Sequence, residues 1–286
     1  MEITAELVKT LREKTDAGMM DCKKALKETG GDMEAAIAYL RQKGLAVASK
    51  RAGRATSEGA IWASIASDHK SGILIEINCE TDFVAKTPAF VELGTKLTEH
   101  LAAVALESVE ELLTQPCPHQ PNLTVTDYLN ETIAKTGESI RIRRFTRYQG
   151  DLVTAYIHHG GKIGVMLELS GGGVAPEAVA AAKDLAMQVA ATSPVAVSRE
   201  EISPELVAQE KAIYEAQAKD SGKPEKIIEK MVGGRLEKFF KEVCLVQQAF
   251  VKNPDITVAQ FLTEVGAKLG GKELKVSRFS RYQVGA

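Results

Sequence analysis

An internal repeat constrains the fold of this chain of 286 residues more than any other feature. Three blocks recur in the same order, and the paired segments begin at Gly59 and Gly150, at 123 and 256, and at 139 and 273. The last pair, SIRIRRFTRYQ and ELKVSRFSRYQ, ends in matching residues that differ only as Thr146 versus Ser280. Three ordered matches predict two copies of one subdomain.

Each copy has patterns for both strands and helices. Each copy is predicted to open with two strands joined by a hairpin, because apolar residues alternate along 73–77 in the first copy and along 165–169 in the second. Thr87-Pro88 and Pro176 are typical helix starts. The last block of each copy is expected to be a strand, so each copy is predicted to be an α+β unit.

The first 55 or so residues predict a small helical unit instead. Thr4 is expected to cap one helix, Asp21 a second over Cys22–Glu28, and Asp32 a third that ends before Gly44. The basic segment that follows, ASKRAGRATSEG, is expected to be a helix or linker that tethers this unit to the repeat.

The second copy contains an insertion that falls within 195–240. Ser203-Pro204 and Lys223-Pro224 both resemble helix starts, on either side of a break at Ser221-Gly222. Two helices with a narrow apolar stripe predict a projecting antiparallel hairpin. Such a stripe fits a homodimer through the hairpin or a hairpin folded back on its own body.

Together these patterns predict an α+β protein in four parts. The parts are a three-helix module with its linker at 1–55, a first core subdomain at 56–148, a second core subdomain at 149–194 and 241–286, and the helical hairpin at 195–240.

Composition and motifs exclude several classes of function. The net charge of −2 gives no overall attraction to nucleic acid or to an anionic membrane. No apolar run is long enough for a membrane span, no signal-peptide core is present, and the four cysteines form no CxxC pair. We therefore expect a cytoplasmic protein with reduced thiols and no membrane contact.

Motifs for small-molecule chemistry are missing. The chain has no phosphate-binding loop, dinucleotide fingerprint, zinc-hydrolase motif or nucleophile elbow. His158-His159 lack a carboxylate or thiol at ligand spacing. We expect no enzyme activity, no metal, no cofactor and no direct nucleotide binding.

Two segments are candidates for binding a partner. In EINCETDFVAK, Phe83 beside Asp82 is either a projecting apolar wedge with a charge, or a core residue next to a turn cap. The pattern alone favours the core, but the equivalent loop of the second copy, SGGGVAP, lacks both residue types and shifts the balance toward the wedge.

The second candidate is LREKTDAGMMDCKKAL. Met19 and Met20 are expected in the turn between the first two helices, where flexible thioethers form an adaptable binding surface with Arg12 and Lys23 at its rim. The alternative is that one methionine fills the core of the small helical module.

A third segment, 141–148, combines arginines with aromatic residues, as RNA-binding strands do. The alternative is that this segment is a structural strand, with Ile140 and Ile142 in the core and the arginines in solvent. The second copy keeps the pattern with less charge, which favours structure, so we do not expect nucleic acid as a partner.

The two candidate segments together resemble the signature segments of the elongation factor Ts family, and the resemblance extends over nearly the whole chain. It implies a ubiquitin-associated-like helical module, a duplicated α+β core and a coiled-coil hairpin. It also implies a guanine nucleotide exchange factor that binds elongation factor Tu with GDP and promotes GDP release, so that GTP can bind during protein synthesis.

The resemblance further implies which residues meet elongation factor Tu. The loop that displaces the partner's magnesium matches Thr81, Asp82, Phe83 and Val84. The N-terminal contacts match Arg12, Met19, Met20 and Lys23, and further core contacts match Gly137 and His158. Longer members carry another helix after the strand where this chain ends, so we expect a lower affinity than theirs.

Overall fold

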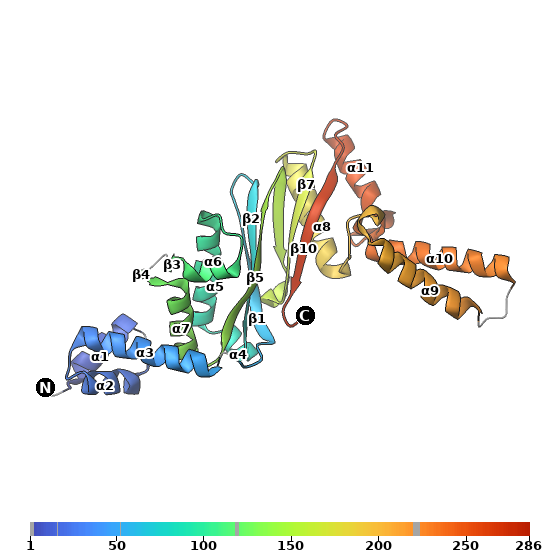
Figure 1. Cartoon of the computed structure of the whole chain (residues 1–286). Helices are drawn as coiled ribbons and strands as arrows, with labels where there is room; N and C mark the ends of the chain where they lie inside the picture. The colour runs from blue at the N-terminus through green and yellow to red at the C-terminus, as the bar shows by residue number, and fades with distance from the viewer. Residues whose placement is uncertain (1–2, 16, 52, 118–119, 220–223) are drawn as a thin grey trace.

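The computed structural model describes residues 3–15, 17–51, 53–117, 120–219 and 224–286, and it is an α+β protein (Figure 1). The predicted fold class is confirmed. A helical module lies at one end, two sheets form the centre and a helical hairpin projects at the other end (Figure 1). Whether the four predicted parts behave as separate domains stays a prediction.

The N-terminal module consists of three helices around a small core. They are α1 (Ala5–Thr15), α2 (Met19–Glu28) and α3 (Met33–Arg51). The Thr4 hydroxyl accepts the Leu7 N–H at 3.3 Å, and the Asp32 carboxylate accepts the Ala35 N–H at 2.8 Å. Both predicted caps are confirmed. The module's core consists of Val8, Leu11, Cys22, Ala25, Leu26 and Ala36.

The second helix begins earlier than predicted. Gly18 is its N-cap, and the Gly18 carbonyl accepts the Cys22 N–H at 2.9 Å. The prediction that Asp21 caps this helix is therefore wrong. Asp21 lies in the first turn, where a carboxylate is favoured by the helix dipole, and it forms an ion pair with Lys43.

The third helix does not end before Gly44, as predicted, but continues to Arg51. Gly44 is buried, and a Cβ there would lie 3.5 Å from Ala134 Cβ on helix α7 (Val125–Thr136). An interior glycine costs a helix about 1 kcal/mol relative to alanine. The packing of α3 on α7 offsets that cost, and local sequence does not reveal this contact.

The repeat produces two antiparallel sheets with the same strand order. The first sheet has the order β1-β2-β5 and the second has the order β6-β7-β10. Their strands are β1 (Glu58–Ile65), β2 (Ser71–Cys79), β5 (Ile140–Gln149), β6 (Leu152–Ile157), β7 (Ile163–Ser170) and β10 (Lys275–Gln283). Equivalent register shifts occur between Glu76 and Ile77 and between Val276 and Arg278. The predicted hairpins at the start of each copy are confirmed.

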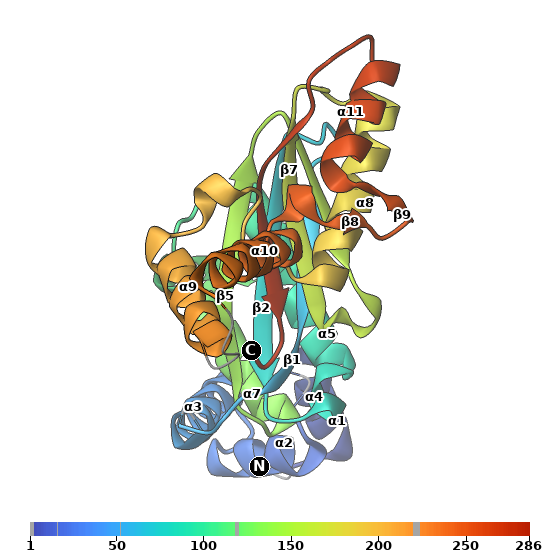
Figure 2. The same cartoon turned by 90° about the vertical axis from the view of Figure 1, so that its right-hand side faces the viewer.

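Helices cover the outer face of each sheet, giving four layers (Figures 1 and 2). The first sheet is covered by α5 (Pro88–Ala103), α6 (Val109–Thr114) and α7, and the second by α8 (Pro176–Thr192) and α11 (Val258–Lys268). The predicted helix starts are confirmed, because Thr87 caps α5 and Pro176 opens α8. Two short hairpins, β3 (Pro116–Cys117) with β4 (Gln120–Thr124) and β8 (Ala249–Phe250) with β9 (Asn253–Thr257), precede α7 and α11.

The inner faces of the two sheets pack against each other through a buried apolar cluster that includes Leu74 and Met166, and a reciprocal pair of arginines stacks on two tyrosines of this cluster. Arg144 stacks 4.1 Å from the Tyr282 ring and pairs with the buried Glu76 at 2.8 Å. The equivalent Arg278 stacks 4.1 Å from the Tyr148 ring and pairs with Glu168 at 2.8 Å. Each copy thus supplies an arginine to the other copy's tyrosine, and the two sheets are held face to face.

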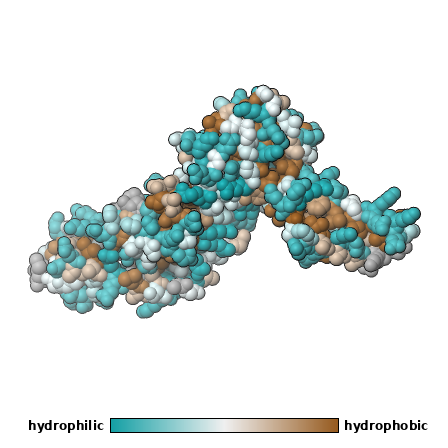
Figure 3. Space-filling model, turned by 45° about the horizontal axis from the view of Figure 1, so that its top comes forward, coloured by the Kyte–Doolittle hydropathy of each residue, from teal (hydrophilic) through white to brown (hydrophobic). Residues whose placement is uncertain are grey.

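The insertion forms an antiparallel hairpin of α9 (Pro204–Lys219) and α10 (Glu225–Val243). α9 begins at Pro204 as predicted, whereas Pro224 is the N-cap of α10; the predicted break at Ser221-Gly222 lies outside the described residues. The hairpin projects away from the sheets, so the folded-back alternative is wrong (Figures 1 and 2). Apolar surface runs along it (Figure 3), and Ile213 and Ile227 are exposed there.

Close packing around Gly94 leads to a stability prediction. A Cβ at Gly94 would overlap the indole ring of Trp62, the single tryptophan of the chain. We expect Gly94→Val to lower the free energy of unfolding by about 2 kcal/mol, because overpacking displaces the ring. Urea unfolding followed by Trp62 fluorescence measures both the stability and the ring's environment. Gly233→Val is the control, since a Cβ there meets nothing within 4 Å; equal behaviour of the two variants contradicts the prediction.

Candidate partner-binding site

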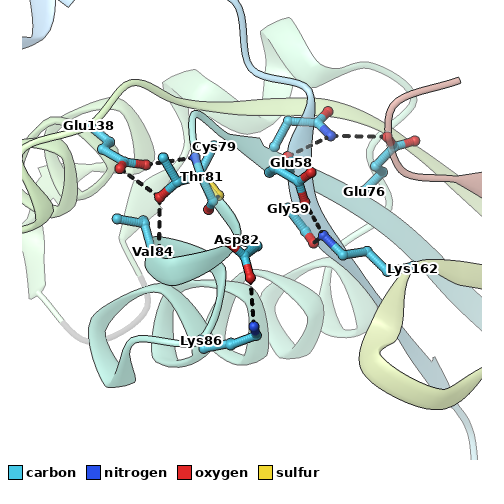
Figure 4. A network of polar contacts seen from close by, with 11 residues as sticks. Glu58, Gly59, Glu76, Cys79, Thr81, Asp82, Val84, Lys86, Glu138 and Lys162 are labelled. Atoms are coloured by element: carbon cyan, nitrogen blue, oxygen red, sulfur yellow. Dashed lines mark hydrogen bonds and ion pairs between the residues drawn. The ribbon is translucent and has the colours of Figure 1, made fainter.

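A single helical turn, α4 (Asp82–Ala85), follows strand β2 and carries the first candidate segment. Thr81 is its N-cap, and the Thr81 hydroxyl accepts the Val84 N–H at 3.4 Å. Lys86 follows the turn, and its ammonium pairs with the Asp82 carboxylate at 2.7 Å (Figure 4). The segment predicted as a loop is therefore a short, capped turn with defined side-chain directions.

The four predicted residues of this turn face two different ways. Phe83 is 79% exposed, so the alternative that it folds into the core is wrong. Asp82 is also solvent-accessible, and its pair with Lys86 lowers the pKa of its carboxyl below the usual value. Val84, in contrast, is buried in the first core and Thr81 is bonded within the protein. Asp82 and Phe83 form the outward face, while Thr81 and Val84 fix it.

Two acidic residues that the sequence analysis did not single out hold this turn in place. Glu138 accepts the Thr81 N–H at 2.9 Å and the Thr81 hydroxyl at 2.7 Å (Figure 4). Glu80 accepts the Ser139 N–H at 2.7 Å, which lowers the pKa of the Glu80 carboxyl. The repeat could have identified both residues from sequence, because the second copy has Gly172 in place of Glu80 and Lys272 in place of Glu138.

Gly137 ends helix α7 immediately before Glu138. Its φ of 76° lies in the left-handed region that glycine adopts without strain, and its N–H bonds to the Ile133 carbonyl at 2.9 Å. The space around a Cβ at Gly137 is open. Gly137 thus directs the chain out of α7 so that Glu138 reaches Thr81.

The second candidate segment lies on helix α2 of the helical module, at the end of the molecule, whereas α4 lies beside the central sheets (Figure 1). Met19 is 59% exposed and Met20 is 75% exposed, so the alternative that one of them fills the core is wrong. Both belong to the first turn of α2, not to a turn between helices as predicted. Arg12 and Lys23 are exposed as well.

His158 is exposed in the connection between β6 and β7, and its Nδ1 lies 3.0 Å from the Tyr156 hydroxyl. Lys162, at the end of the same connection, bonds to the Gly59 carbonyl at 3.0 Å and its charge acts on Asp82. The connection between these two strands of the second copy therefore lies beside the first copy's α4. The side chain of His159 lies outside the described residues.

Arg144 and Arg147, two of the four arginines of strand β5, are engaged within the protein. Arg144 pairs with Glu76 and stacks on Tyr282, and Arg147 donates to the carbonyls of Leu101 and Val104 at the end of α5. Ile140 and Ile142 are buried, as the structural interpretation of this segment predicts. Arg141 and Arg143 of the same strand are exposed.

Other kinds of site find no support in the described part of the chain. No group of three or more His, Cys, Asp or Glu side chains there is arranged to hold a metal ion. Among the same residues, no helix has the length and apolar character needed to cross a membrane.

The cysteines give a testable chemical property. All four are free and buried, and burial raises the pKa of the Cys79 thiol to about 12. A raised pKa keeps the Cys79 thiol protonated at pH 8, and the protonated thiol is a poor nucleophile. We expect native protein to react with a chromogenic disulfide reagent at pH 8 at least 100-fold more slowly than protein in urea. Rapid reaction of any thiol in the native state contradicts this expectation.

Comparisons with known proteins identify relatives of this chain. A family model described as Elongation factor TS matches residues 80–286. A Clostridium botulinum protein named Elongation factor Ts is 45% identical over 285 residues, which cover 99% of this chain and 93% of that protein. A Clostridium perfringens protein of the same name is 47% identical over the same shares of both chains.

Exposed apolar side chains on α4 of the duplicated core and on α2 of the helical module are suited to binding another protein, and with these matches the chain is a translation elongation factor. It belongs to the elongation factor Ts family.

Proposed function

We propose that this protein is a guanine nucleotide exchange factor, which binds elongation factor Tu with GDP and promotes GDP release so that GTP can bind. The observation that carries the proposal is Phe83, exposed beside Asp82 on a turn that the protein itself holds in place. A soluble protein gains nothing in stability from an exposed phenylalanine, whereas an interface gains about 1.5–3 kcal/mol when such a side chain is buried.

The mechanism requires preferential binding, not catalysis on the nucleotide. An exchange factor must bind the nucleotide-free partner more tightly than the GDP-bound partner. A thousandfold faster release needs about 4 kcal/mol of such preference in the transition state for release. An aromatic wedge that parts helices next to the nucleotide, with a carboxylate that disturbs the magnesium ligands, is a plausible source of this energy.

The remaining candidate residues supply a second area of contact. Met19 and Met20 give adaptable apolar surface, with Arg12 and Lys23 at its rim, for the partner's nucleotide-binding domain. Gly137 and His158 offer further contacts around α4. In this proposal the protein works in the cytoplasm without cofactor, metal or nucleic acid. A homodimer through the exposed Ile213 and Ile227 of the hairpin is a separate proposal.

The direct test follows fluorescent GDP bound to elongation factor Tu. We expect this protein to accelerate release by at least a hundredfold over the spontaneous rate. Release at the spontaneous rate, with the protein folded and in excess, refutes the proposed function. Sedimentation of the protein alone, with and without Ile213→Lys, tests the homodimer separately.

A further inference from the structure

We propose that Glu138 is a positioning residue, which together with Glu80 clamps turn α4 so that Asp82 and Phe83 are presented in a preformed orientation. This inference rests on the proposed function. Glu138 does not need to touch the partner, because it acts through Thr81. The term "clamp" below means the contacts between residues 80–81 and residues 138–139.

In the clamp, each of the two chain segments supplies a carboxylate that accepts hydrogen bonds from the other segment. Glu138 uses one carboxylate oxygen for the Thr81 N–H at 2.9 Å and the other for the Thr81 hydroxyl at 2.7 Å. Glu80 in turn accepts the Ser139 N–H at 2.7 Å. Hydrogen bonds to an ionised carboxylate are roughly twice as strong as neutral ones, so these three bonds fix the start of α4 against the end of α7.

Phe83 depends on this clamp because its own side chain has little to hold it. A ring that is 79% exposed takes its direction from its backbone. The Thr81 carbonyl accepts the Ala85 N–H at 3.3 Å and the Cys79 thiol at 3.1 Å, so Thr81 is bonded through its N–H, carbonyl and hydroxyl (Figure 4). Fixing Thr81 therefore fixes the single turn that carries Phe83.

The clamp also reaches the helical module. Glu80 pairs with Arg54 at 3.1 Å and with Arg51, the last residue of α3, at 3.7 Å. The helix α3 belongs to the module that carries Met19 and Met20. Both proposed contact areas are thus attached to one point of the scaffold, which reduces the ordering entropy that binding must overcome.

The second copy shows that the scaffold does not need the clamp. Gly172, Gly173 and Lys272 stand where the first copy has Glu80, Thr81 and Glu138. There the equivalent strand ends meet directly, since a Cβ at Gly171 would overlap the Glu273 carbonyl. That copy also lacks the Asp-Phe pair. The clamp occurs in the copy that presents an exposed aromatic side chain, which points to presentation as its purpose.

Substitutions of Glu138 separate presentation from general stability. We expect Glu138→Ala to lower the kcat/KM for GDP release by about tenfold, since an unfixed wedge must be ordered during binding. Glu138→Gln should retain most of the activity, because its amide can accept the Thr81 N–H and donate to the Thr81 hydroxyl. Glu264→Ala, at an exposed site on α11, is the control and should behave as wild type.

Two further measurements test whether Glu138 acts on GDP release through turn α4. Hydrogen exchange at the amides of Ala85, Lys86 and Thr87, which are bonded within the turn, should accelerate in Glu138→Ala. In a background that already carries Asp82→Ala and Phe83→Ala, Glu138→Ala should cause no additional loss of kcat/KM, because the clamp then has nothing to present.

The outcomes that overturn the inference are distinct from failure of the proposed function. Wild-type kcat/KM in Glu138→Ala would refute positioning of this turn. A further tenfold loss when Glu138→Ala is added to the Asp82→Ala and Phe83→Ala background would refute it as well. If the wild-type protein itself does not accelerate GDP release, the proposed function fails. In that case unchanged exchange at the Ala85–Thr87 amides in Glu138→Ala still refutes the clamp, because that readout needs no partner.

Discussion

Replacing Asp82 and Phe83 together by alanine is expected to slow factor-dependent GDP release from elongation factor Tu by about 100-fold. This figure corresponds to the roughly 2–4 kcal/mol that truncation of a central interface residue costs. Because Phe83 is 79% exposed and Asp82 pairs only at the surface with Lys86, the free energy of unfolding should change by less than about 0.5 kcal/mol. Stopped-flow release of fluorescent GDP and urea unfolding measure the two quantities.

Val174→Ala is the matched control for that experiment. Val174 is an exposed apolar residue in the corresponding loop of the second copy, at 47% exposure. It should leave GDP release unchanged. A double variant of Asp82 and Phe83 that exchanges as fast as wild type would eliminate the wedge mechanism, whatever the behaviour of the control.

Replacing Arg144 by alanine should lower the free energy of unfolding strongly. Glu76 is completely buried, and Arg144→Ala would leave its carboxylate without its closest cation. Breaking a buried ion pair on one side costs about 3–5 kcal/mol; because the Arg144 side chain is itself 37% exposed, we expect about 3 kcal/mol. Loss of the stack on Tyr282 contributes to this figure. Thermal and urea unfolding measure it.

The repeat provides the control for Arg144. Arg278 makes the same two contacts in the second copy, but its partner Glu168 has a side chain that is 14% exposed. Water can solvate the Glu168 carboxylate once the arginine is gone, so Arg278→Ala should cost only about 1 kcal/mol. Equal losses for the two variants would show that burial of the carboxylate does not determine the cost.

Most of the secondary structure could be predicted, because its determinants are local. The alternation along 73–77 and the caps at Thr4, Asp32 and Thr87 depend on neighbouring residues alone. The predicted helix end before Gly44 is wrong for the opposite reason. That glycine faces Ala134 on another helix, and a contact between distant residues leaves no mark in the local pattern.

The candidate site was only partly predictable. The sequence identified the Asp82-Phe83 segment, but its pattern could not decide whether Phe83 points inward or outward, since an apolar residue next to a turn does either. The neighbouring Val84 takes the buried place, which leaves Phe83 outside. The roles of Glu80 and Glu138 depend on pairing between the ends of β2 and β5, so they required the three-dimensional structure.

The reciprocal packing of Arg144 on Tyr282 and of Arg278 on Tyr148 gives this single polypeptide an internal interface like that of a twofold-symmetric dimer. Two separate chains joined this way would come apart when diluted below their dissociation constant. Here the polypeptide connects the halves, so the local concentration of one half near the other is fixed by the connection. The sandwich of sheets should therefore persist at nanomolar protein, and its melting temperature should not depend on concentration.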